Sequence, residues 1–344
     1  MIVVTGATGH IGSALVRELI TQMPKKKQKK IRVFVLPSES LKPLEGLNVD
    51  VVYGDVRDYR SLIRAFKGAE IVYHLAGIVT IGSGKTRLLK EVNVKGTINV
   101  CNACRDLGIP RLVYVSSIHA FKEPPKGIPI KETKDFSPKN VRGDYAKSKA
   151  AATRAVLNSV KRGLNAVIVH PTGVIGPYEY NLSNMGQLVM DFMRKKLLAI
   201  VDGSYDFVDV RDVAKGIILA GKKGRKGESY ILSGEQITVK SMMKILEAET
   251  GIPAPKTVIP KWFAFITGFF SELYYKARKQ KPLFTSYSVS TLSSNSLTNS
   301  EKAKRELGYK SRSVKQSLID TVQWMKKHLL KSKENKLEYG KEKD

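Results

Sequence analysis

A glycine-rich turn at the N-terminus constrains the fold of this chain more than any other feature. A β-branched run, Ile2–Thr5, leads into glycines at positions 6, 9 and 12, and residues 13–20 then repeat apolar side chains at helical spacing. Gly6 permits a tight turn, Gly9 removes a side chain where a pyrophosphate approaches the backbone, and Gly12 lets the helix pack closely. The segment predicts a strand, a turn and a helix that hold a dinucleotide phosphate, although such turns also arise for purely steric reasons.

Further apolar strand patterns alternate with helical patterns along the first half of the chain. We expect strands at residues 31–36, 48–54, 71–77 and 111–117, and helices ending at Phe66, spanning 86–107 and spanning 144–160. This alternation predicts an α/β fold with a doubly wound parallel sheet, the Rossmann class, over residues 1–178. Residues 179–330 are expected to complete the core and to form a smaller C-terminal region that caps the substrate site. Residues 331–344 read as a disordered basic tail.

The charge of the chain is strongly basic. Lysine and arginine number 59 against 31 acidic residues, a formal charge of +28, which raises affinity for phosphates, nucleic acid and anionic lipid without specifying any of them. No nucleic-acid motif accompanies this charge, so we expect no specific nucleic-acid partner. No signal-like segment precedes the first strand and no apolar run is long enough to span a bilayer, which favours a cytoplasmic protein. Cys101 and Cys104 stand without further ligands, so we expect no metal site.

The most aromatic stretch, residues 262–275, lies in the second half of the chain. It is too short and too interrupted to cross a membrane. One interpretation is a cap helix whose rings line an apolar substrate pocket or complete the core. The other is an interfacial helix resting on anionic lipid, with its rings buried and the flanking lysines at the headgroups.

The end of the second strand bears on which dinucleotide binds. An NAD-binding fold commonly places an acid there to bond the adenosine ribose, but this chain reads Leu36-Pro37-Ser38-Glu39-Ser40. A 2′-phosphate would be less opposed here than by an aspartate, and Ser38 or Ser40 could bond it, which favours NADP over NAD. Glu39 lies close enough to keep NAD open.

Three side chains suggest proton transfer. Tyr145 and Lys149 are four residues apart and therefore share a helical face, where an ammonium would lower the pKa of the phenol. Ser117, at the end of the fifth strand, could bond a substrate oxygen. Together they suit the interconversion of a carbonyl and an alcohol beside a nicotinamide. The alternative is that Tyr145 and Lys149 form a surface pair on an amphipathic helix.

Several ordered motifs resemble the extended short-chain dehydrogenase/reductases, also called the NAD-dependent epimerase/dehydratase family. They are the turn at residues 5–12, Gly54-Asp55, His74-Leu-Ala-Gly77, Ser116-Ser117 and Tyr145-Ala-Lys-Ser-Lys149, and the likeness continues to about residue 328. The resemblance implies that Tyr145 is the acid/base, that Lys149 lowers its pKa while holding the nicotinamide ribose, and that Ser117 polarises the substrate carbonyl. The implied cofactor contacts are Gly6, Thr8, Gly9, His10 and Ile11, with Gly12, at the pyrophosphate, Asp55 and Val56 at the adenine, Leu75, Ala76 and Gly77 at the middle, and Pro171, Gly173 and Val174 beside the nicotinamide.

Departures from the family pattern indicate the substrate class. Dehydratases of this family place an acid just after the serine pair, but here Ile118 and His119 follow. Sugar epimerases usually carry an arginine where this chain has Tyr205. The pattern is more similar to the dihydroflavonol-4-reductase and 3β-hydroxysteroid dehydrogenase branch, whose substrates are apolar ketones or alcohols. His119 either contacts such a substrate or faces solvent.

These observations favour an NAD(P)-dependent oxidoreductase that reduces a ketone or aldehyde of a mainly apolar small molecule. Two alternatives stay open: a sugar-nucleotide epimerase with bound NAD, and a non-catalytic sensor that binds the dinucleotide without turnover. The expected partner is a small-molecule carbonyl substrate. Peripheral contact with an anionic membrane and a homodimer remain open, and the sequence specifies neither the substrate nor the oligomeric state.

Overall fold

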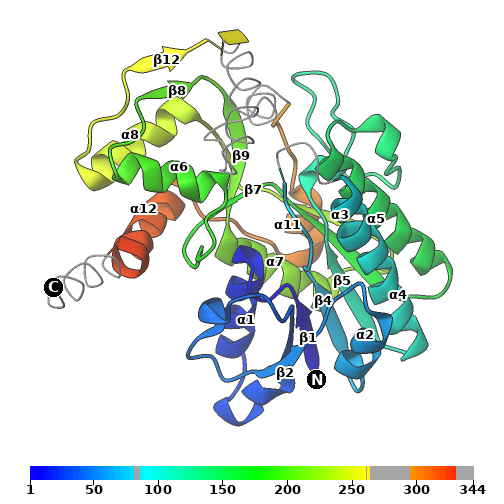
Figure 1. Ribbon diagram of the computed structural model, residues 1–344. Coiled ribbons are helices and arrows are strands. Elements are labelled where there is room, and N and C mark those ends of the chain that lie inside the picture. Colours follow the sequence, from blue (N-terminus) through cyan, green and yellow to red (C-terminus); the bar gives the residue numbers. More distant parts are fainter. Residues whose placement is uncertain (81–85, 261, 264–294, 331–344) are drawn as a thin grey trace, which may run out of the picture.

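A single parallel sheet forms the centre of the molecule. The computed structural model describes residues 1–80, 86–260, 262–263 and 295–330. Seven parallel strands lie in the order β10-β6-β5-β4-β1-β2-β3 (Figure 1). They are β1 (Ile2–Thr5), β2 (Ile31–Val35), β3 (Asp50–Tyr53), β4 (Ile71–His74), β5 (Arg111–Val115), β6 (Ala166–Pro171) and β10 (Ser229–Leu232). The sheet confirms the predicted α/β fold, and its order reverses between β1 and β4, the place where such sheets bind ligands.

Helices cover both faces of the sheet, because the buried strands alternate their side chains between two cores. Val4 of β1 packs into the core on one face and Val3 into the core on the other. The first face is covered by α1 (His10–Thr21), α7 (Val210–Lys223) and α11 (Glu301–Leu307). The second is covered by α2 (Tyr59–Phe66), α4 (Thr97–Asp106) and α5 (Asp144–Lys161). Cys101 and Cys104 are buried, unpaired thiols of α4.

The continuous helix predicted over residues 86–107 is interrupted. The structure has a short α3 (Thr86–Leu89), a π-helical segment η3 (Lys90–Gly96) and then α4. Inside η3 the buried Asn93 amide accepts from the backbone N–H of Ile78 at 2.7 Å and donates to Ser148 Oγ at 3.0 Å. A wide turn of this kind is frequent at functional sites, and here it presents an amide to the loop after β4.

The chain beyond β6 builds a cap and then returns to the sheet. Three strands, β7 (Gly173–Ile175), β9 (Ser204–Asp209) and β11 (Glu235–Thr238), form one small sheet, and β8 (Ala199–Val201) with β12 (Thr257–Ile259) form another. The helices of the cap are α6 (Asn184–Met193), α8 (Val239–Thr250) and α12 (Val314–Met325). Short helical turns complete the described chain at η1 (Lys25–Lys30), η2 (Lys42–Leu44), η4 (Ile118–Ala120), η5 (Pro138–Asn140) and η6 (Lys326–Leu330). The predicted tail at 331–344 and most of the aromatic stretch after Phe263 lie outside the described residues.

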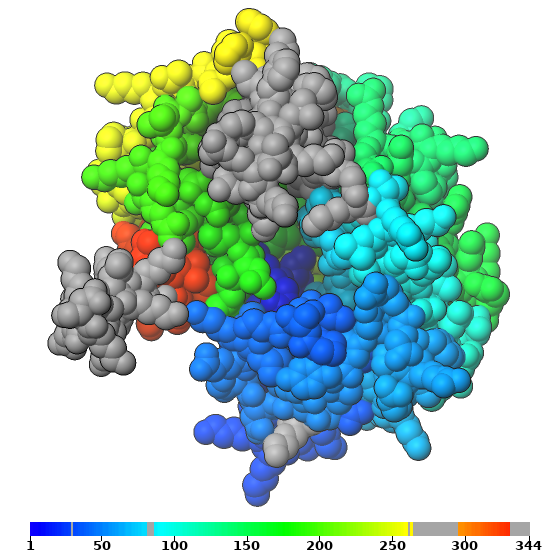
Figure 2. Space-filling model, in the orientation of Figure 1, coloured from blue at the N-terminus to red at the C-terminus, as the bar shows by residue number. Residues whose placement is uncertain are grey.

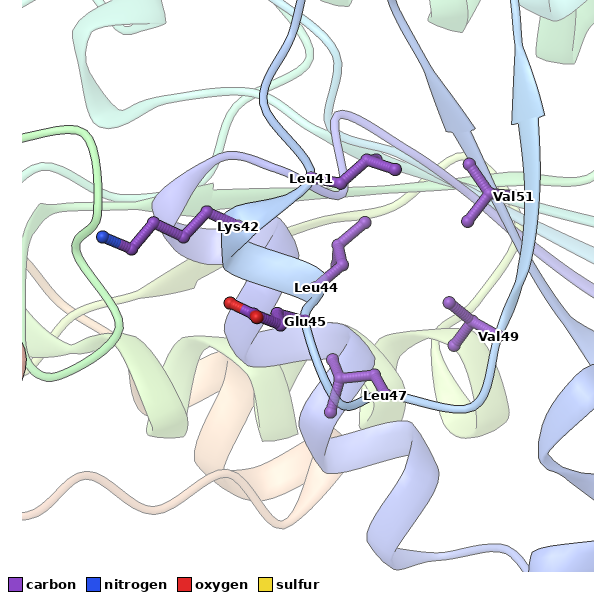
Figure 3. Close-up of a pocket in the computed structure, with 7 residues that line it drawn as sticks. All are labelled: Leu41, Lys42, Leu44, Glu45, Leu47, Val49 and Val51. Carbon is purple, nitrogen blue, oxygen red and sulfur yellow. The ribbon is translucent and has the colours of Figure 1, made fainter.

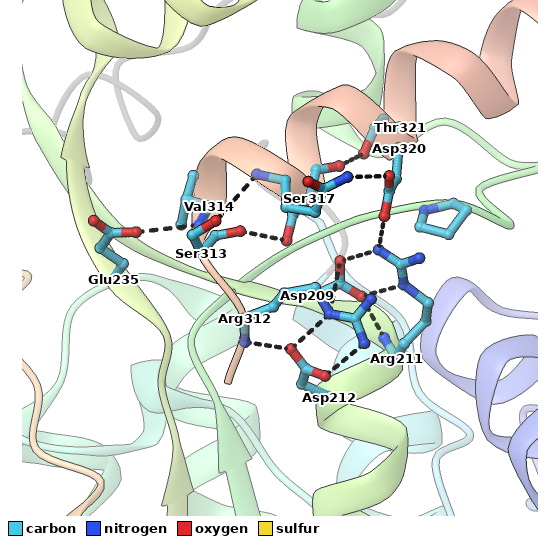
Figure 4. A network of polar contacts seen from close by, with 12 residues as sticks. Asp209, Arg211, Asp212, Glu235, Arg312, Ser313, Val314, Ser317, Asp320 and Thr321 are labelled. Carbon is cyan, nitrogen blue, oxygen red and sulfur yellow. Dashed lines mark hydrogen bonds and ion pairs between the residues drawn. The ribbon is translucent and has the colours of Figure 1, made fainter. Parts of the chain in front are cut away.

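A network of charges around two buried aspartates joins α12 to the start of α7 (Figure 4). The fully buried Asp209 carboxylate pairs with Arg211 at 2.7 Å, and Arg211 also pairs with Asp320 on α12 at 2.5 Å. Arg312 pairs with Asp212 at 2.8 Å. Because an isolated buried charge is costly, these mutual partners hold the cap helix in one position relative to the sheet.

No helix of the described ranges is both long and apolar enough to cross a bilayer.

Candidate active site

The glycine turn shows which glycines the protein itself requires. Gly6 has φ +69°, and a Cβ built on it would lie 2.6 Å from the backbone N of Ala76. A Cβ on Gly12 would lie 2.0 Å from the carbonyl oxygen of Gly6. A Cβ on Gly9, in contrast, would meet only that same oxygen, at an ordinary 3.4 Å. Packing therefore explains Gly6 and Gly12, whereas the space at Gly9 is left for something that approaches the turn.

The N-terminus of α1 faces that space. Gly9 is the N-cap residue and provides no side-chain cap, so the first turn of the helix presents backbone N–H groups. The side chains of the turn are held elsewhere: Thr8 Oγ1 donates to Glu39 Oε2 at 2.5 Å, and His10 Nε2 lies 2.9 Å from the carbonyl oxygen of Pro177. Figure 2 shows a hollow between the cap and the sheet half, with atoms of the N-terminal segment at its bottom. The turn fits a pyrophosphate bound by backbone groups.

Replacing Gly9 and Gly12 with alanine separates ligand space from packing. We expect Gly9→Ala to fold with a loss of less than about 1 kcal/mol, because its Cβ has room and only the cap preference changes. Its affinity for a nicotinamide dinucleotide should fall at least about tenfold. Gly12→Ala is the matched control and should lose at least about 2 kcal/mol of stability, because its Cβ meets backbone. Thermal unfolding and fluorescence titration measure both; unchanged dinucleotide affinity in Gly9→Ala would contradict this assignment.

The other predicted cofactor contacts lie along the same edge of the sheet. The backbone N–H of Ala76 donates to Thr5 Oγ1 at 3.2 Å, which holds the residues after β4 against β1. A Cβ on Gly77 would lie 3.6 Å from Lys149 Nζ, so this loop passes directly beside the lysine. Leu75 is half-buried in the same loop.

The residues predicted to surround the adenine are held by neighbouring groups. The Asp55 carboxylate pairs with Arg57 at 2.6 Å, which lowers the pKa of that carboxyl. Val56 is buried beneath Gly96 of η3, where a Cβ would lie 2.7 Å from the valine side chain. Ser38 is exposed after β2, and Ile11 is half-buried in the first turn of α1. Their contacts with a cofactor remain predictions.

Residues predicted to flank the nicotinamide follow β6. Pro171 is its buried last residue and pairs with Leu232 of β10. Gly173 and the half-buried Val174 begin β7, where a Cβ on Gly173 would lie 2.8 Å from the ring of Phe207. The close approach of this ring explains the glycine by packing alone.

The structure brings Ser117, Tyr145 and Lys149 to the end of β5. Ser116 points inward, with its Oγ 2.7 Å from Thr153 Oγ1, whereas Ser117 Oγ accepts from the backbone N–H of His119 at 3.3 Å. Lys149 Nζ donates to the carbonyl oxygen of Val115 at 3.0 Å. The two serines therefore differ. Ser116 bonds Thr153 inside the protein, whereas Ser117 lies next to His119 at the end of the sheet.

Burial lowers the pKa of two groups at this site. It lowers the pKa of Lys149 to about 8, so the lysine carries its proton at pH 7 in a nearly dry environment. It lowers the pKa of His119 to about 4, so that imidazole is neutral at pH 7. The site thus holds one buried positive charge beside an uncharged aromatic wall.

That wall consists of His119 and Tyr205. The His119 ring lies edge-on to the Tyr145 ring, with centroids 6.1 Å apart, and stacks on the Tyr205 ring at the same separation. Tyr205 Oη lies 3.2 Å from His119 Nε2. The tyrosine stands where the resemblance implies an arginine, so an aromatic ring, and not a cation, packs against His119. His119 is half-buried rather than turned fully to solvent.

Sequence reasoning gave Asn93 and Tyr205 no contact in the site, and it considered Glu39 only as a residue close enough to keep NAD open. Asn93 accepts from and donates to the loop after β4, Glu39 reaches the glycine turn, and Tyr205 bonds His119. Each pairing joins residues from separate elements. One signal was available: an asparagine three residues before a glycine in a predicted helix is a weak helix former that needs another reason to be there.

An apolar cavity of about 510 Å³ lies elsewhere, beneath the loop between β2 and β3 (Figure 3). Its lining residues are Leu41, Lys42, Leu44, Glu45, Leu47, Val49 and Val51. None of them belongs to the predicted site, and most of the lining side chains are aliphatic. We assign it no role.

A parallel sheet with a glycine turn at its switch point, and a serine, tyrosine and lysine at the same edge, define a dinucleotide-binding α/β protein. A model of the NAD dependent epimerase/dehydratase family matches residues 2–233. The chain therefore belongs to this family, the extended short-chain dehydrogenase/reductases, and is an enzyme of that type, which confirms the resemblance.

Individual relatives cover nearly the whole chain. It is 35% identical over 327 residues to sterol demethylase protein B of Methylococcus capsulatus, covering 94% of this chain and 97% of that protein. It is 31% identical over 329 residues to a protein of Synechocystis sp. provisionally named dihydroflavonol 4-reductase, covering 94% of each. The crystal structure of gox2253 matches with a TM-score of 0.82 at 29% identity, covering 96% of this chain and 98% of that one.

Proposed function

We propose that this enzyme reduces a ketone or aldehyde of a lipophilic small molecule with a nicotinamide dinucleotide, and that Tyr145 is the proton donor. One observation carries the proposal. Lys149 Nζ, bonded to the end of β5, lies beside the glycine loop after β4, and Ser117 and Tyr145 are placed around that same edge. The fit of the turn at Gly9 to a pyrophosphate supports a dinucleotide there.

Each residue has a separate task in the proposed reaction. When bound, the reduced dinucleotide supplies a hydride to the carbonyl carbon. Ser117 Oγ donates a hydrogen bond to the carbonyl oxygen and orients it. Tyr145 then gives its phenolic proton to that oxygen as negative charge develops. The Lys149 ammonium stabilises the phenolate that remains and holds the cofactor ribose, as the family resemblance implies.

The surroundings of Tyr145 favour an apolar substrate. His119 is neutral at pH 7, its ring lies edge-on to the Tyr145 ring, and the Tyr205 ring stacks on His119. Neither His119 nor Tyr205 would provide a positive charge for the diphosphate of a sugar nucleotide. A fused or prenylated carbon skeleton, in contrast, packs well on aromatic rings. The names of two relatives, a sterol-modifying protein and a dihydroflavonol reductase, agree with this class.

A screen of carbonyl compounds tests the proposal. Purified enzyme is mixed with reduced dinucleotide and a panel of lipophilic ketones and aldehydes, with sugar nucleotides as the comparison panel. We expect oxidation of the cofactor by members of the first panel. Tight retention of NAD through purification, with interconversion of sugar nucleotides and no net oxidation, would support the epimerase alternative. Dinucleotide binding without turnover on either panel would support the sensor.

We also propose that NAD(H) binds more tightly than NADP(H). The residues after β2 favour NADP, but Glu39 Oε2 accepts from Thr8 Oγ1 in the glycine turn, beside which the adenosine ribose of a dinucleotide would bind. A carboxylate there accepts from a ribose hydroxyl and repels a 2′-phosphate.

Glu39→Gln provides the test of this preference. We expect the variant to bind NADPH at least about tenfold more tightly than the wild type, because repulsion of the 2′-phosphate is removed. Its affinity for NADH should fall slightly. Glu45→Gln, another exposed glutamate of the same loop, is the matched control and should leave both affinities unchanged. A wild-type enzyme that binds NADPH more tightly than NADH in a fluorescence titration would contradict the proposal.

A further inference from the structure

The outer end of the cap exposes a row of large apolar side chains. We call Leu198, Val258, Trp262 and Phe263 the apolar row; their exposed fractions are 83%, 46%, 67% and 46%. Leu198 immediately precedes β8, and Val258 lies on the parallel strand β12 opposite Ile200. Ile200 itself is buried in the cap core, whereas Leu198 before β8 and Val258 on the paired strand are exposed. Figure 1 shows β8 and β12 at the end of the molecule opposite β2.

Basic side chains are close to the apolar row in the sequence. The two segments that carry it, residues 194–202 and 252–263, contain five lysines or arginines and one acid, Asp202. Lys195, Lys196 and Lys256 are exposed beside the row. A cleft of about 190 Å³ opens at the same end, lined by Phe192, Lys195, Leu197, Ile252 and Pro253. Exposed apolar side chains with lysines nearby, next to a small apolar cleft, are typical of a surface that binds anionic lipid headgroups.

We propose that the apolar row docks this enzyme on the surface of an anionic lipid bilayer. Trp262, Phe263 and Leu198 would enter the region between headgroups and acyl chains, while the three lysines contact lipid phosphates. The use of such docking rests on the proposed function, because a lipophilic carbonyl substrate dissolves in the bilayer and would reach the cap from there. The binding itself does not depend on that function. Of the interfacial helix predicted over 262–275, only its first two residues are described, and the proposal stands on the described surface alone.

Vesicle flotation with the full chain tests the proposal. The probes are vesicles of phosphatidylcholine alone and of phosphatidylcholine with about one third phosphatidylglycerol, at about 50 mM salt where screening is weak. Each lysine near an anionic surface strengthens binding about fivefold, so Lys195→Gln, Lys196→Gln and Lys256→Gln together should weaken binding at least tenfold. The control carries Lys25→Gln, Lys26→Gln and Lys27→Gln, which removes the same charge from exposed η1 and should stay within about twofold.

A second pair of variants separates the apolar row from charge. Leu198→Ser with Trp262→Ser should also reduce vesicle binding at least about tenfold, whereas Ile98→Ser with Ile128→Ser, exposed elsewhere, should not. Absence of binding to anionic vesicles, or equal losses in the cap and η1 variants, would overturn the proposal. A light-scattering mass that drops from dimer to monomer in the Leu198 and Trp262 variant would assign the row to a second copy instead. Reduction of a water-soluble carbonyl, measured in parallel, reports on the proposed function separately.

Discussion

Tyr145→Phe is expected to lose about 10³-fold in kcat for carbonyl reduction, because the proton donor is removed while the ring is kept. The His119 ring lies edge-on to the Tyr145 ring, and Ser117 and Lys149 make their hydrogen bonds at the same end of β5. Cofactor binding should change less than about threefold, since the hydroxyl contributes little to a large dinucleotide interface. Steady-state kinetics and a fluorescence titration on the same preparation measure the two quantities.

A tyrosine far from the site provides the control for this substitution. Tyr53 is exposed on the edge strand β3, and Tyr53→Phe should retain full activity. A Tyr145→Phe enzyme with wild-type kcat would show that another group protonates the substrate. A variant that loses cofactor affinity and activity together would show that the phenol binds the dinucleotide rather than acting as the acid.

Lys149→Met should affect activity and stability in opposite directions. Desolvation lowers the pKa of the lysine from 10.5 to about 8, which corresponds to roughly 3 kcal/mol of unfavourable charge burial at pH 7. Methionine fills a similar volume without charge, and the lost hydrogen bond to Val115 offsets about 1 kcal/mol of the gain. We therefore expect the variant to be about 2 kcal/mol more stable at pH 7 and at least about 10²-fold less active.

The pH dependence of this stability difference follows from the direction of the pKa shift. Below about pH 8 the folded enzyme carries a buried ammonium, and the penalty is fully present. Between about pH 8 and the ordinary lysine pKa of 10.5, the folded state loses its proton before the unfolded state does, so the penalty declines. The gain from Lys149→Met should accordingly be largest at pH 7, and above the ordinary lysine pKa only the loss of about 1 kcal/mol from the missing hydrogen bond should remain.

Lys147, exposed on the same helix, is the matched control for this pair of measurements. Lys147→Met should leave kcat and the midpoint of denaturant unfolding close to their wild-type values. A Lys149→Met enzyme that is destabilised at pH 7 would contradict the burial argument, and one that remains fully active would contradict the role of the ammonium.

Local patterns predicted the parts of the fold that depend on neighbouring residues. The turn of Gly6 and Gly12 and the helix after it follow from strand and helix periodicity and from glycine spacing, and the structure has them where expected. The shared helical face of Tyr145 and Lys149 follows from their separation alone. These features need no information about distant residues.

Features that depend on long-range contacts could not be predicted from the sequence. The π-helical segment η3 exists because the Asn93 amide bonds a loop fifteen residues earlier. Glu39 meets Thr8 only after β2 has aligned with β1, and Tyr205 meets His119 only after the cap folds over β5. Sequence periodicity does not predict such long-range contacts. The inferences about the cofactor and the substrate nevertheless depend on them.

Isotope transfer tests the central claim most directly. The enzyme is incubated with a lipophilic ketone identified in the screen and with reduced dinucleotide that carries deuterium at the transferable position of the nicotinamide, and the product is analysed by mass spectrometry. The account predicts an alcohol with one deuterium on its carbinol carbon, formed by the wild type and not by Tyr145→Phe. A product without deuterium on that carbon, or equal product from the variant, would contradict it.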